Sequence, residues 1–520
     1  MRMFTLPARR AHSLPLAVIL AAGLGLRLWG SGFGLPAFTH YHPDEHAVVE
    51  RATAILQTGE WGPERFNYPP FAAYLQVAGF AASLAWGRAL GRWDQAPPYP
   101  LPQHFQLARA TTALVGTLTI LAVYLAGRQV WGRRVGLLAA ALLAGNYLHI
   151  IHSHYATMDV MAGLFVALCL LFSQRALVGR GAGNYALAGL CAGLAGATKY
   201  NGAVALAMPV AALLLGTQGR HLVVGRLLAT AAGLGLGFFG GNPFALARWS
   251  AFGQGVTAVL EHYGTGHPGF EGLGNWLWYL YGFVTSADAA WVVAGLAGLL
   301  GAARFGGRHG LLLLVFPVTY FWLVSSFVVR FERNMVLLLP FLALGGGWLL
   351  SHASQRFGRG MSPRFRRSLA VGGAAALLAL PLAAGLAFDV QLSRIDHREV
   401  AGLWLEQNVE AGARIAIEHY AIPFDHGAYE VADVIRIADH DLEWYRQAGY
   451  DLLVVSDGTW EVLRRQARYY GDRLRAYDEL VAGSTLLAEF VPDPPGIVVA
   501  GYQTVAVYHF APVRIYRLPQ

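Results

Sequence analysis

The chain has 520 residues, of which 55% are hydrophobic and only 13% are charged. Its formal net charge is +8, and its mean hydropathy is +0.41. Long, nearly charge-free runs recur from about residue 14 to residue 388, which is typical of a polytopic helical membrane protein. The positive charge lies in short arginine clusters between these runs, so the composition argues against a nucleic-acid-binding protein.

The first apolar run, residues 14–26, follows Arg9 and Arg10, a pattern shared by secretory signals and first membrane spans. We expect an uncleaved span, because Arg27 interrupts its end and no small-residue cleavage site follows. Together with the later runs it predicts about eleven transmembrane helices, since backbone groups in lipid must be satisfied internally. These helices are expected at residues 14–31, 106–126, 135–151, 158–174, 183–198, 201–217, 222–241, 283–303, 310–328, 335–351 and 368–388.

The arginine clusters also predict the orientation of the bundle. They fall on every second connection if the N-terminus is cytoplasmic. We therefore expect a multi-pass protein of the plasma (inner) membrane, with the tail from residue 389 on the outer, periplasmic side. The connections expected on that same side are residues 32–105, 152–157, 199–200, 242–282 and 329–334.

The first outer connection is expected to contain two further helices. Residues 71–90 are apolar enough to span, but a span there would place the arginine cluster of residues 128–134 outside and invert every later connection. This run is therefore predicted to lie along or dip into the outer surface. An earlier helix is predicted from Pro43 to Thr58, with two acids in its first turn, where the helix dipole favours negative charge.

Beyond residue 389 charges return and the apolar runs become short. Strands are expected at Ala413–Ile417, Leu452–Val455, Leu486–Phe490 and Ala506–Phe510, and helices at Glu399–Asn408 and Trp460–Leu480. The predicted fold is thus an all-α polytopic membrane bundle in residues 1–388, followed by a soluble, outward-facing α/β domain in residues 389–520.

The residues from His40 to His46 hold two adjacent carboxylates, Asp44 and Glu45, among three histidines. Adjacent acids on an outer loop can divide tasks, one accepting a proton from a hydroxyl while the other orients a partner or binds a cation. The alternative is a helix start that is merely decorated with acids. His42, Asp44 and His46 are also candidate ligands of a divalent metal ion, although their spacing matches no compact zinc signature.

Two further charged residues are expected on the same face. Asp159 lies at the outer end of the fourth span, where a carboxylate usually faces a polar cavity. Lys199 is the only lysine in the chain and lies at the corner between two spans. A compact ammonium can meet a phosphate where a guanidinium would not fit, whereas the alternative is a lysine without a special role.

Positive charge on an outer connection runs against the rule that arginines gather on the cytoplasmic side, so it calls for an explanation. Arg330 and Arg333 flank the tenth span there, where they could bind phosphate, pair with Glu332 or anchor lipid headgroups. The chain has no phosphate-binding glycine loop, no G-x-S-x-G and no CxxC, so nucleotide hydrolysis, serine hydrolase chemistry and thiol redox work are not expected.

The order of these motifs resembles a known family. A first span, a loop with His-Pro-Asp-Glu, a Tyr-Pro-Pro before an apolar helix, an Asp at the outer end of the fourth span and a Thr-Lys-Tyr corner follow one another in residues 14–350. This order resembles the GT-C class of integral-membrane glycosyltransferases. It is closest to the phospholipid-carrier-dependent branch that includes the protein O-mannosyltransferases and the aminoarabinose transferases acting on lipid A.

The resemblance implies transfer of a sugar from a polyprenyl-phosphate donor to a lipid, glycan or protein hydroxyl. It implies catalytic roles for Asp44, Glu45 and Asp159, with Asp44 as the base that deprotonates the acceptor hydroxyl or as a group that helps to orient it. Substrate contacts are expected from residues in or near the motifs, namely His42, Tyr68, His154, Lys199, Tyr200, Arg330 and Arg333. A direct displacement would invert the anomeric centre, and because no long domain is inserted between spans, protein mannosylation is disfavoured. A transporter or flippase is the alternative, which would need charged residues midway along several spans.

Overall fold

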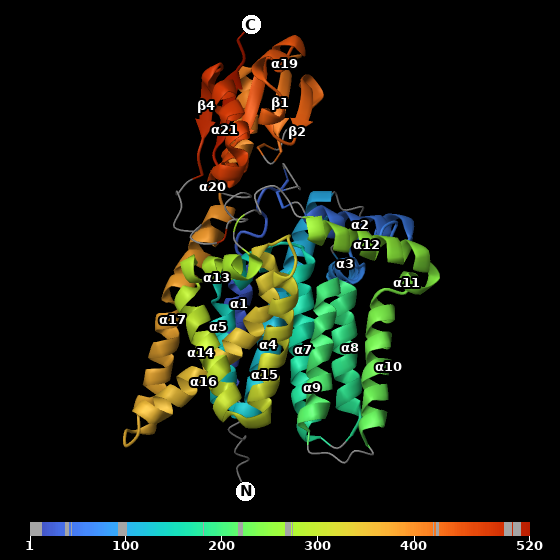
Figure 1. Cartoon of the computed structure of the whole chain (residues 1–520), viewed down its shortest axis with the longest axis vertical. Coiled ribbons are helices and arrows are strands. Elements are labelled where there is room, and N and C mark those ends of the chain that lie inside the picture. The colour runs from blue at the N-terminus through green and yellow to red at the C-terminus, as the bar shows by residue number, and fades with distance from the viewer. Residues whose placement is uncertain are drawn as a thin grey trace.

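The computed structural model describes residues 13–36, 41–42, 44–91, 101–179, 181–216, 222–265, 272, 274–419, 421–422, 426–492, 502 and 511–519. A bundle of long helices carries a smaller α/β domain at one end, and α17 leads from the bundle to that domain (Figure 1). The predicted fold class is confirmed.

The bundle is built from the predicted apolar runs. Its helices are α1 (Leu14–Leu28), α4 (Leu101–Trp131), α5 (Arg133–Ala144), α6 (Tyr147–His154), α7 (Met158–Val178), α8 (Gly183–Thr198), α9 (Ala207–Leu215), α10 (Val223–Gly241), α13 (Asn275–Thr285), α14 (Ala289–Phe305), α15 (Gly307–Ser325), α16 (Leu339–Phe357) and α17 (Pro363–Leu392). Two 3₁₀ segments, η2 (Tyr200–Leu206) and η4 (Glu332–Leu338), lead into α9 and α16.

Apolar composition makes this an integral membrane protein. Among the described residues, six helices are long and apolar enough to cross a membrane, or up to eight if each of two bent helix pairs is one span. Each of the eleven predicted runs coincides with at least part of a helix, but several of these helices are short. The number of eleven spans therefore stays a prediction.

Two predicted spans contain a break. The run at 135–151 is divided into α5 and α6, which meet at 59°, and α6 begins where the Asn146 side chain accepts a hydrogen bond from the His149 amide at 2.9 Å. The run at 283–303 overlaps the break between α13 and α14, which meet at 118°. Asp288 lies in this second break and accepts the amides of Tyr147 and Leu148, each at 3.0 Å, so the two breaks stabilise each other.

Small residues allow close packing between α8 and α10. A Cβ atom on Gly233 would lie 2.1 Å from the Ala186 carbonyl oxygen, and one on Gly193 would lie 2.3 Å from that of Leu234. Glycine is therefore required for these helices to approach, as is common between helices in membranes.

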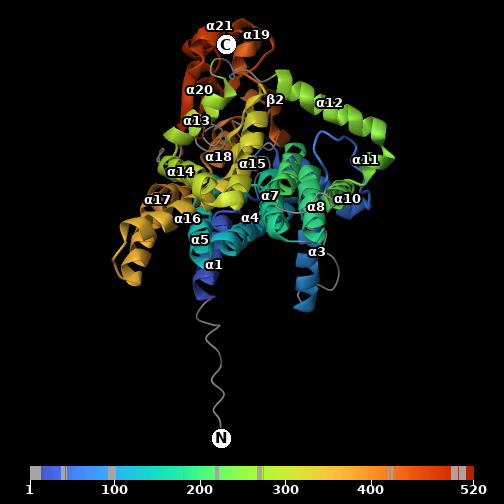
Figure 2. The same ribbon diagram turned by 60° about the horizontal axis from the view of Figure 1, so that its bottom comes forward.

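Four helices lie at the end of the bundle that carries the α/β domain: α2 (Glu45–Thr58), α3 (Phe71–Ala89), α11 (Phe244–Ala247) and α12 (Trp249–Thr265). Figure 1 shows α3 nearly end-on and Figure 2 shows it along its length, so it lies at a large angle to the bundle helices. This agrees with the prediction that residues 71–90 form a surface helix. The predicted start of α2 at Pro43 lies outside the described residues, and Asp44 directly precedes the helix.

The C-terminal domain contains a five-stranded sheet in the order β2-β1-β3-β5-β4. The three strands β1, β2 and β3 are parallel, whereas β5 is antiparallel to both β3 and β4. The elements are α18 (His397–Asn408), β1 (Arg414–Glu418), η5 (His426–Ala428), β2 (Glu430–Val434), η6 (Ile437–Asp439), α19 (Leu442–Gln447), β3 (Leu452–Ser456), α20 (Asp457–Arg465), α21 (Ala467–Ala482), β4 (Thr485–Phe490) and β5 (Val513–Arg517).

Three of the four predicted strands in this domain are present. The fourth, at residues 506–510, lies outside the described residues, and the sequence reasoning missed β2 and β5. The predicted helix at 460–480 is divided into α20 and α21 at Gln466, which departs from helical geometry, and α21 is kinked at Tyr470.

Candidate active site

A cavity of about 520 Å³ lies at the end of the bundle beneath the surface helices. Each of the five connections predicted to face outward contributes to its lining. The polar lining residues are Asp44, Asn67, Tyr68, Thr157, Asp159, Lys199, Tyr200, Asn201, His262, Tyr263 and Arg333. The structure thus brings Asp44, Asp159 and Lys199 together, although 155 residues separate the first from the last in the chain.

Asp44 presents its carboxylate to this cavity from the start of α2. The Tyr68 hydroxyl donates a hydrogen bond to Asp44 Oδ1 at 2.9 Å. Arg333, from η4, forms an ion pair with Oδ2. The carboxylate is therefore held from two sides, by a neutral donor and by a cation, and only 9% of the residue is exposed.

Asp159 and Lys199 form a second charged pair in the same cavity. Asp159 lies in the first turn of α7, where the helix dipole favours a carboxylate. Lys199 lies between α8 and η2 in an extended conformation, and its Nζ is 2.5 Å from Asp159 Oδ1. Nζ also donates to Asn334 Oδ1 at 2.9 Å, and the Asn334 amide donates to the Tyr279 hydroxyl at 3.1 Å. One cavity thus holds two carboxylates and two cations, arranged as two ion pairs.

Glu45 does not reach the cavity. Its carboxylate is fully buried and pairs in two places with Arg109, through Nε at 2.9 Å and Nη2 at 2.8 Å. It also accepts the Ala156 amide at 2.8 Å. Arg109 in turn donates to the Ser31 and Phe33 carbonyl oxygens. This geometry ties α2 to α4, and the position of Glu45 outside the cavity lining does not support the prediction that it is a second catalytic acid.

The three predicted histidines also lie outside the cavity lining. His42 is buried with its ring 4.4 Å from that of Tyr155, and its Nδ1 accepts the Asp44 amide at 3.2 Å. His154 Nε2 lies 2.9 Å from the Trp29 carbonyl oxygen, and His46 is exposed. Within the described part of the chain, no group of three or more His, Cys, Asp or Glu side chains could hold a metal ion. The metal ion stays an untested prediction.

The remaining predicted contacts divide in the same way. Tyr68 and Tyr200 line the cavity, and the Tyr200 hydroxyl donates to the Phe66 carbonyl oxygen at 2.7 Å. Arg330 does not line it: the residue is 1% exposed, and its guanidinium carbon lies 5.3 Å from the centre of the Trp278 ring. Direct substrate contact by Arg330 is therefore not supported by its position.

Sequence reasoning missed two residues that organise the site. Arg109 lies near one end of a predicted span, and a charge in an apolar run is a signal for a buried partner. Asn334 follows Arg333 directly but carries no charge, so nothing in its local pattern distinguishes it.

Comparison with known proteins gives a partial family match. A family model described as dolichyl-phosphate-mannose-protein mannosyltransferase matches residues 103–241, which run from α4 to the end of α10. A search of curated protein sequences found no match.

Solved structures match over nearly the whole chain. ArnT from Cupriavidus metallidurans in the apo state is 14% identical with a TM-score of 0.55, over 96% of this chain and 98% of that chain. The same protein bound to undecaprenyl phosphate is 15% identical with a TM-score of 0.53, over 98% of each chain. The apo oligosaccharyltransferase of Archaeoglobus fulgidus is 14% identical with a TM-score of 0.51, over 92% of this chain and 73% of that chain. The chain therefore has the GT-C fold of these integral-membrane glycosyltransferases, as its motifs predicted.

Proposed function

We propose that the protein transfers a sugar from a polyprenyl-phosphate-linked donor to an acceptor hydroxyl on the outer side of the membrane. The observation that carries this proposal is the single cavity that holds Asp44, Arg333 and the Asp159–Lys199 pair at one end of an apolar helical bundle. A base and a set of cations are the groups that this transfer requires.

Asp44 is the proposed general base. The acceptor oxygen attacks the anomeric carbon as the bond from that carbon to the phosphate oxygen breaks, and the acceptor proton passes to Asp44. Because attack and departure occur on opposite faces, the anomeric centre is inverted. Tyr68 donates to the oxygen opposite the one paired with Arg333, which fixes the direction in which the carboxylate points.

Lys199 and Arg333 are the proposed partners of the departing phosphate. The carrier leaves as an anion, so prearranged cations stabilise the charge that develops. Arg333 forms an ion pair with Asp44. A phosphate that attracts Arg333 would free one oxygen of Asp44 for the acceptor, which couples donor binding to the availability of the base. Asp159 and Asn334 hold the Lys199 ammonium in place.

The carrier also needs an apolar surface beside the cavity. A groove of about 680 Å³ lies between α13, α14, α15 and the start of α16, with a lining that is almost entirely apolar. One helix separates the groove from the cavity: Phe321 and Trp322 of α15 line the groove, and Leu323 and Phe327 line the cavity. We assign the isoprenoid chain to this groove. A carrier of this class is supported by the undecaprenyl phosphate bound to ArnT and by the dolichol phosphate bound to AglB, the oligosaccharyltransferase of Archaeoglobus fulgidus.

The test is a transfer assay with the purified full chain in lipid vesicles. A panel of polyprenyl-phosphate sugars is offered with lipid, glycan and peptide acceptors, with and without a chelator, and products are identified by mass. We expect one donor to be consumed and its sugar to appear on an acceptor. Asp44→Asn should lower kcat at least a hundredfold, because a positioned base contributes roughly 10²–10⁴-fold.

The matched control is Glu64→Gln, an exposed acid between α2 and α3 that does not line the cavity. It should transfer as the unmodified protein does. Normal transfer by Asp44→Asn would remove its role as base. If labelled donor crosses the bilayer unchanged and no sugar is transferred to any acceptor, the protein is a flippase rather than a transferase.

A further inference from the structure

The segment that carries Asp44 is anchored on both sides. Glu45 pairs with Arg109 of α4, and the His42 ring packs against Tyr155. The third anchor is Tyr41, which is 1% exposed and points toward Glu399 of α18. Of the described residues 41, 42, 44 and 45, only Asp44 lines the cavity. The position of its carboxylate therefore depends on its neighbours.

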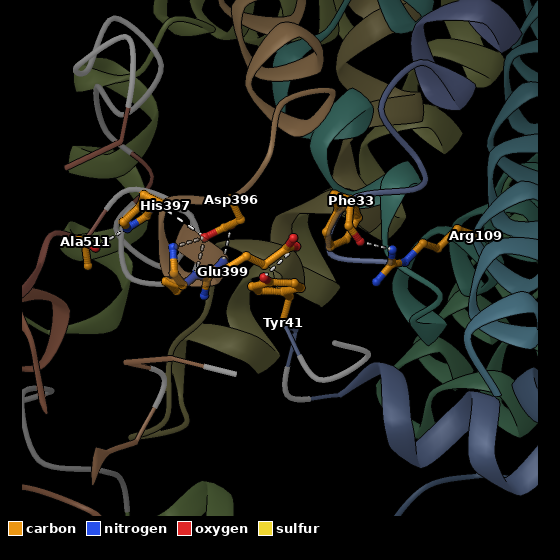
Figure 3. A network of polar contacts seen from close by, with 8 residues as sticks. Phe33, Tyr41, Arg109, Asp396, His397, Glu399 and Ala511 are labelled. Atoms are coloured by element: carbon orange, nitrogen blue, oxygen red, sulfur yellow. Dashed lines mark hydrogen bonds and ion pairs between the residues drawn. The ribbon is translucent and has the colours of Figure 1, made fainter. Parts of the chain in front are cut away.

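Tyr41 is held by two side chains of α18 (Figure 3). Its hydroxyl donates to Glu399 Oε1 at 3.0 Å, and the Arg398 guanidinium carbon lies 4.2 Å from the centre of its ring. Arg398 is itself fixed by two hydrogen bonds to Asp396, each of 2.8 Å. Burial raises the pKa of the Tyr41 hydroxyl well above its ordinary value, so this hydroxyl stays a donor.

Helix α18 belongs to the C-terminal domain. His397 Nε2 donates to the Ala511 carbonyl oxygen at 2.8 Å, just before β5, and Leu405 packs in one core with Ile415 of β1. A second contact fastens the same part of the chain to the bundle, since the Tyr502 hydroxyl donates to Asp288 Oδ2 at 2.8 Å. The side chains that contact Tyr41, Glu399 and Arg398, therefore belong to a helix that is packed within a folded domain.

We infer that Tyr41 is a positioning residue through which the C-terminal domain, by way of Glu399 and Arg398, sets the placement of Asp44. This inference rests on the proposed function for its catalytic part, but the mechanical link can be measured without activity. It gives residues 389–520 a role in the reaction although none of them lines the cavity.

The test uses the full chain with Tyr41→Phe, which removes only the hydroxyl, and Glu399→Ala, which removes its acceptor. Amide hydrogen exchange of residues 44–50 should become at least several-fold faster in both variants. In the transfer assay kcat should fall about tenfold, as expected for losing a hydrogen bond to a charged acceptor, while KM for the donor stays unchanged. Glu399→Gln keeps an acceptor oxygen and should restore most of kcat.

The matched control is Glu406→Ala, an exposed acid on the same helix, which should change neither quantity. The double variant Tyr41→Phe/Glu399→Ala should be no worse than Tyr41→Phe alone, because both act through one bond. Unchanged exchange in residues 44–50 would overturn the inference. Faster exchange with an unchanged kcat would also overturn it, as would a change in the donor KM without a change in kcat. Faster exchange in a protein that transfers no sugar would refute the proposed function and leave the link between the domain and the loop established.

Discussion

Replacing Glu45 by alanine should destabilise the bundle far more than replacing its neighbour Asp44. The Glu45 and Arg109 side chains are both fully buried and joined by two hydrogen bonds of 2.8–2.9 Å. Removing one partner of such a pair costs about 3–5 kcal/mol, because the other charge stays buried. Asp44→Asn removes an ion pair at the wall of the cavity, where the side chains keep 12–19% exposure, so the charge left on Arg333 is less completely buried and the loss should be smaller.

The assay is thermal unfolding of purified protein in detergent, followed by the fraction that stays monodisperse. Glu45→Ala should unfold at a clearly lower temperature than the unmodified protein, and Asp44→Asn close to it. The control is Glu45→Leu/Arg109→Met, which leaves no unpaired charge and should recover much of the loss. A Glu45→Ala protein as heat-resistant as the unmodified chain would refute the structural role assigned to this pair.

Two further predictions concern Lys199 and Glu418. Lys199→Ala should raise the donor KM roughly 10- to 100-fold, because one charge-assisted contact to the phosphate is lost. The double variant Asp159→Asn/Lys199→Ala should show the same rise without leaving a buried unpaired charge. The control is Arg65→Ala, which removes an exposed cation, and an unchanged KM in Lys199→Ala would remove the phosphate assignment. Burial raises the pKa of Glu418 from 4.5 to about 8, so the folded domain retains a proton that the unfolded chain releases, and the stability present below pH 4.5 is lost as pH rises to about 8. Amide protection of β1 and β3 in the full chain should fall over that interval, and constant protection after correction for intrinsic exchange would contradict it.

The helices and several residues of the cavity could be predicted from the sequence, because both follow from apolar runs and from the alternation of arginine clusters along the chain. Long apolar runs must be helical in lipid, and alternating arginine clusters predict which connections share a side. That reasoning grouped Asp44, Asp159 and Lys199, and the cavity contains all three. No pairwise contact had to be known, since alternating connections of an up-and-down bundle meet at the same end.

The breaks in the spans and the additional strands were not accessible. The turn at Asn146 depends on Asp288, which lies 142 residues further along and accepts the amides that the break exposes. Strand β2 is short and half-exposed, with Asp433 as its fourth residue, so its alternation is weak without its neighbour β1. Arg330 and Arg333 look equivalent in sequence, yet only Arg333 lines the cavity. Arg330 precedes η4, before the extended residue Phe331, and packs on Trp278, whereas Arg333 lies in the first turn of η4.

The different fates of Asp44 and Glu45 follow from helix geometry. Successive residues on a helix point about 100° apart, so adjacent acids at its start take different directions, and here only Asp44 lines the cavity. When one faces the substrate, the other is turned toward the bundle, where an ionised carboxylate survives only with a partner. Arg109 is that partner, and the pair fixes the rotation of α2 about its axis. Under the proposed function the acidic pair is one reactive group and one anchor, and a buried acid beside a candidate base is a reason to search the neighbouring helix for a cation.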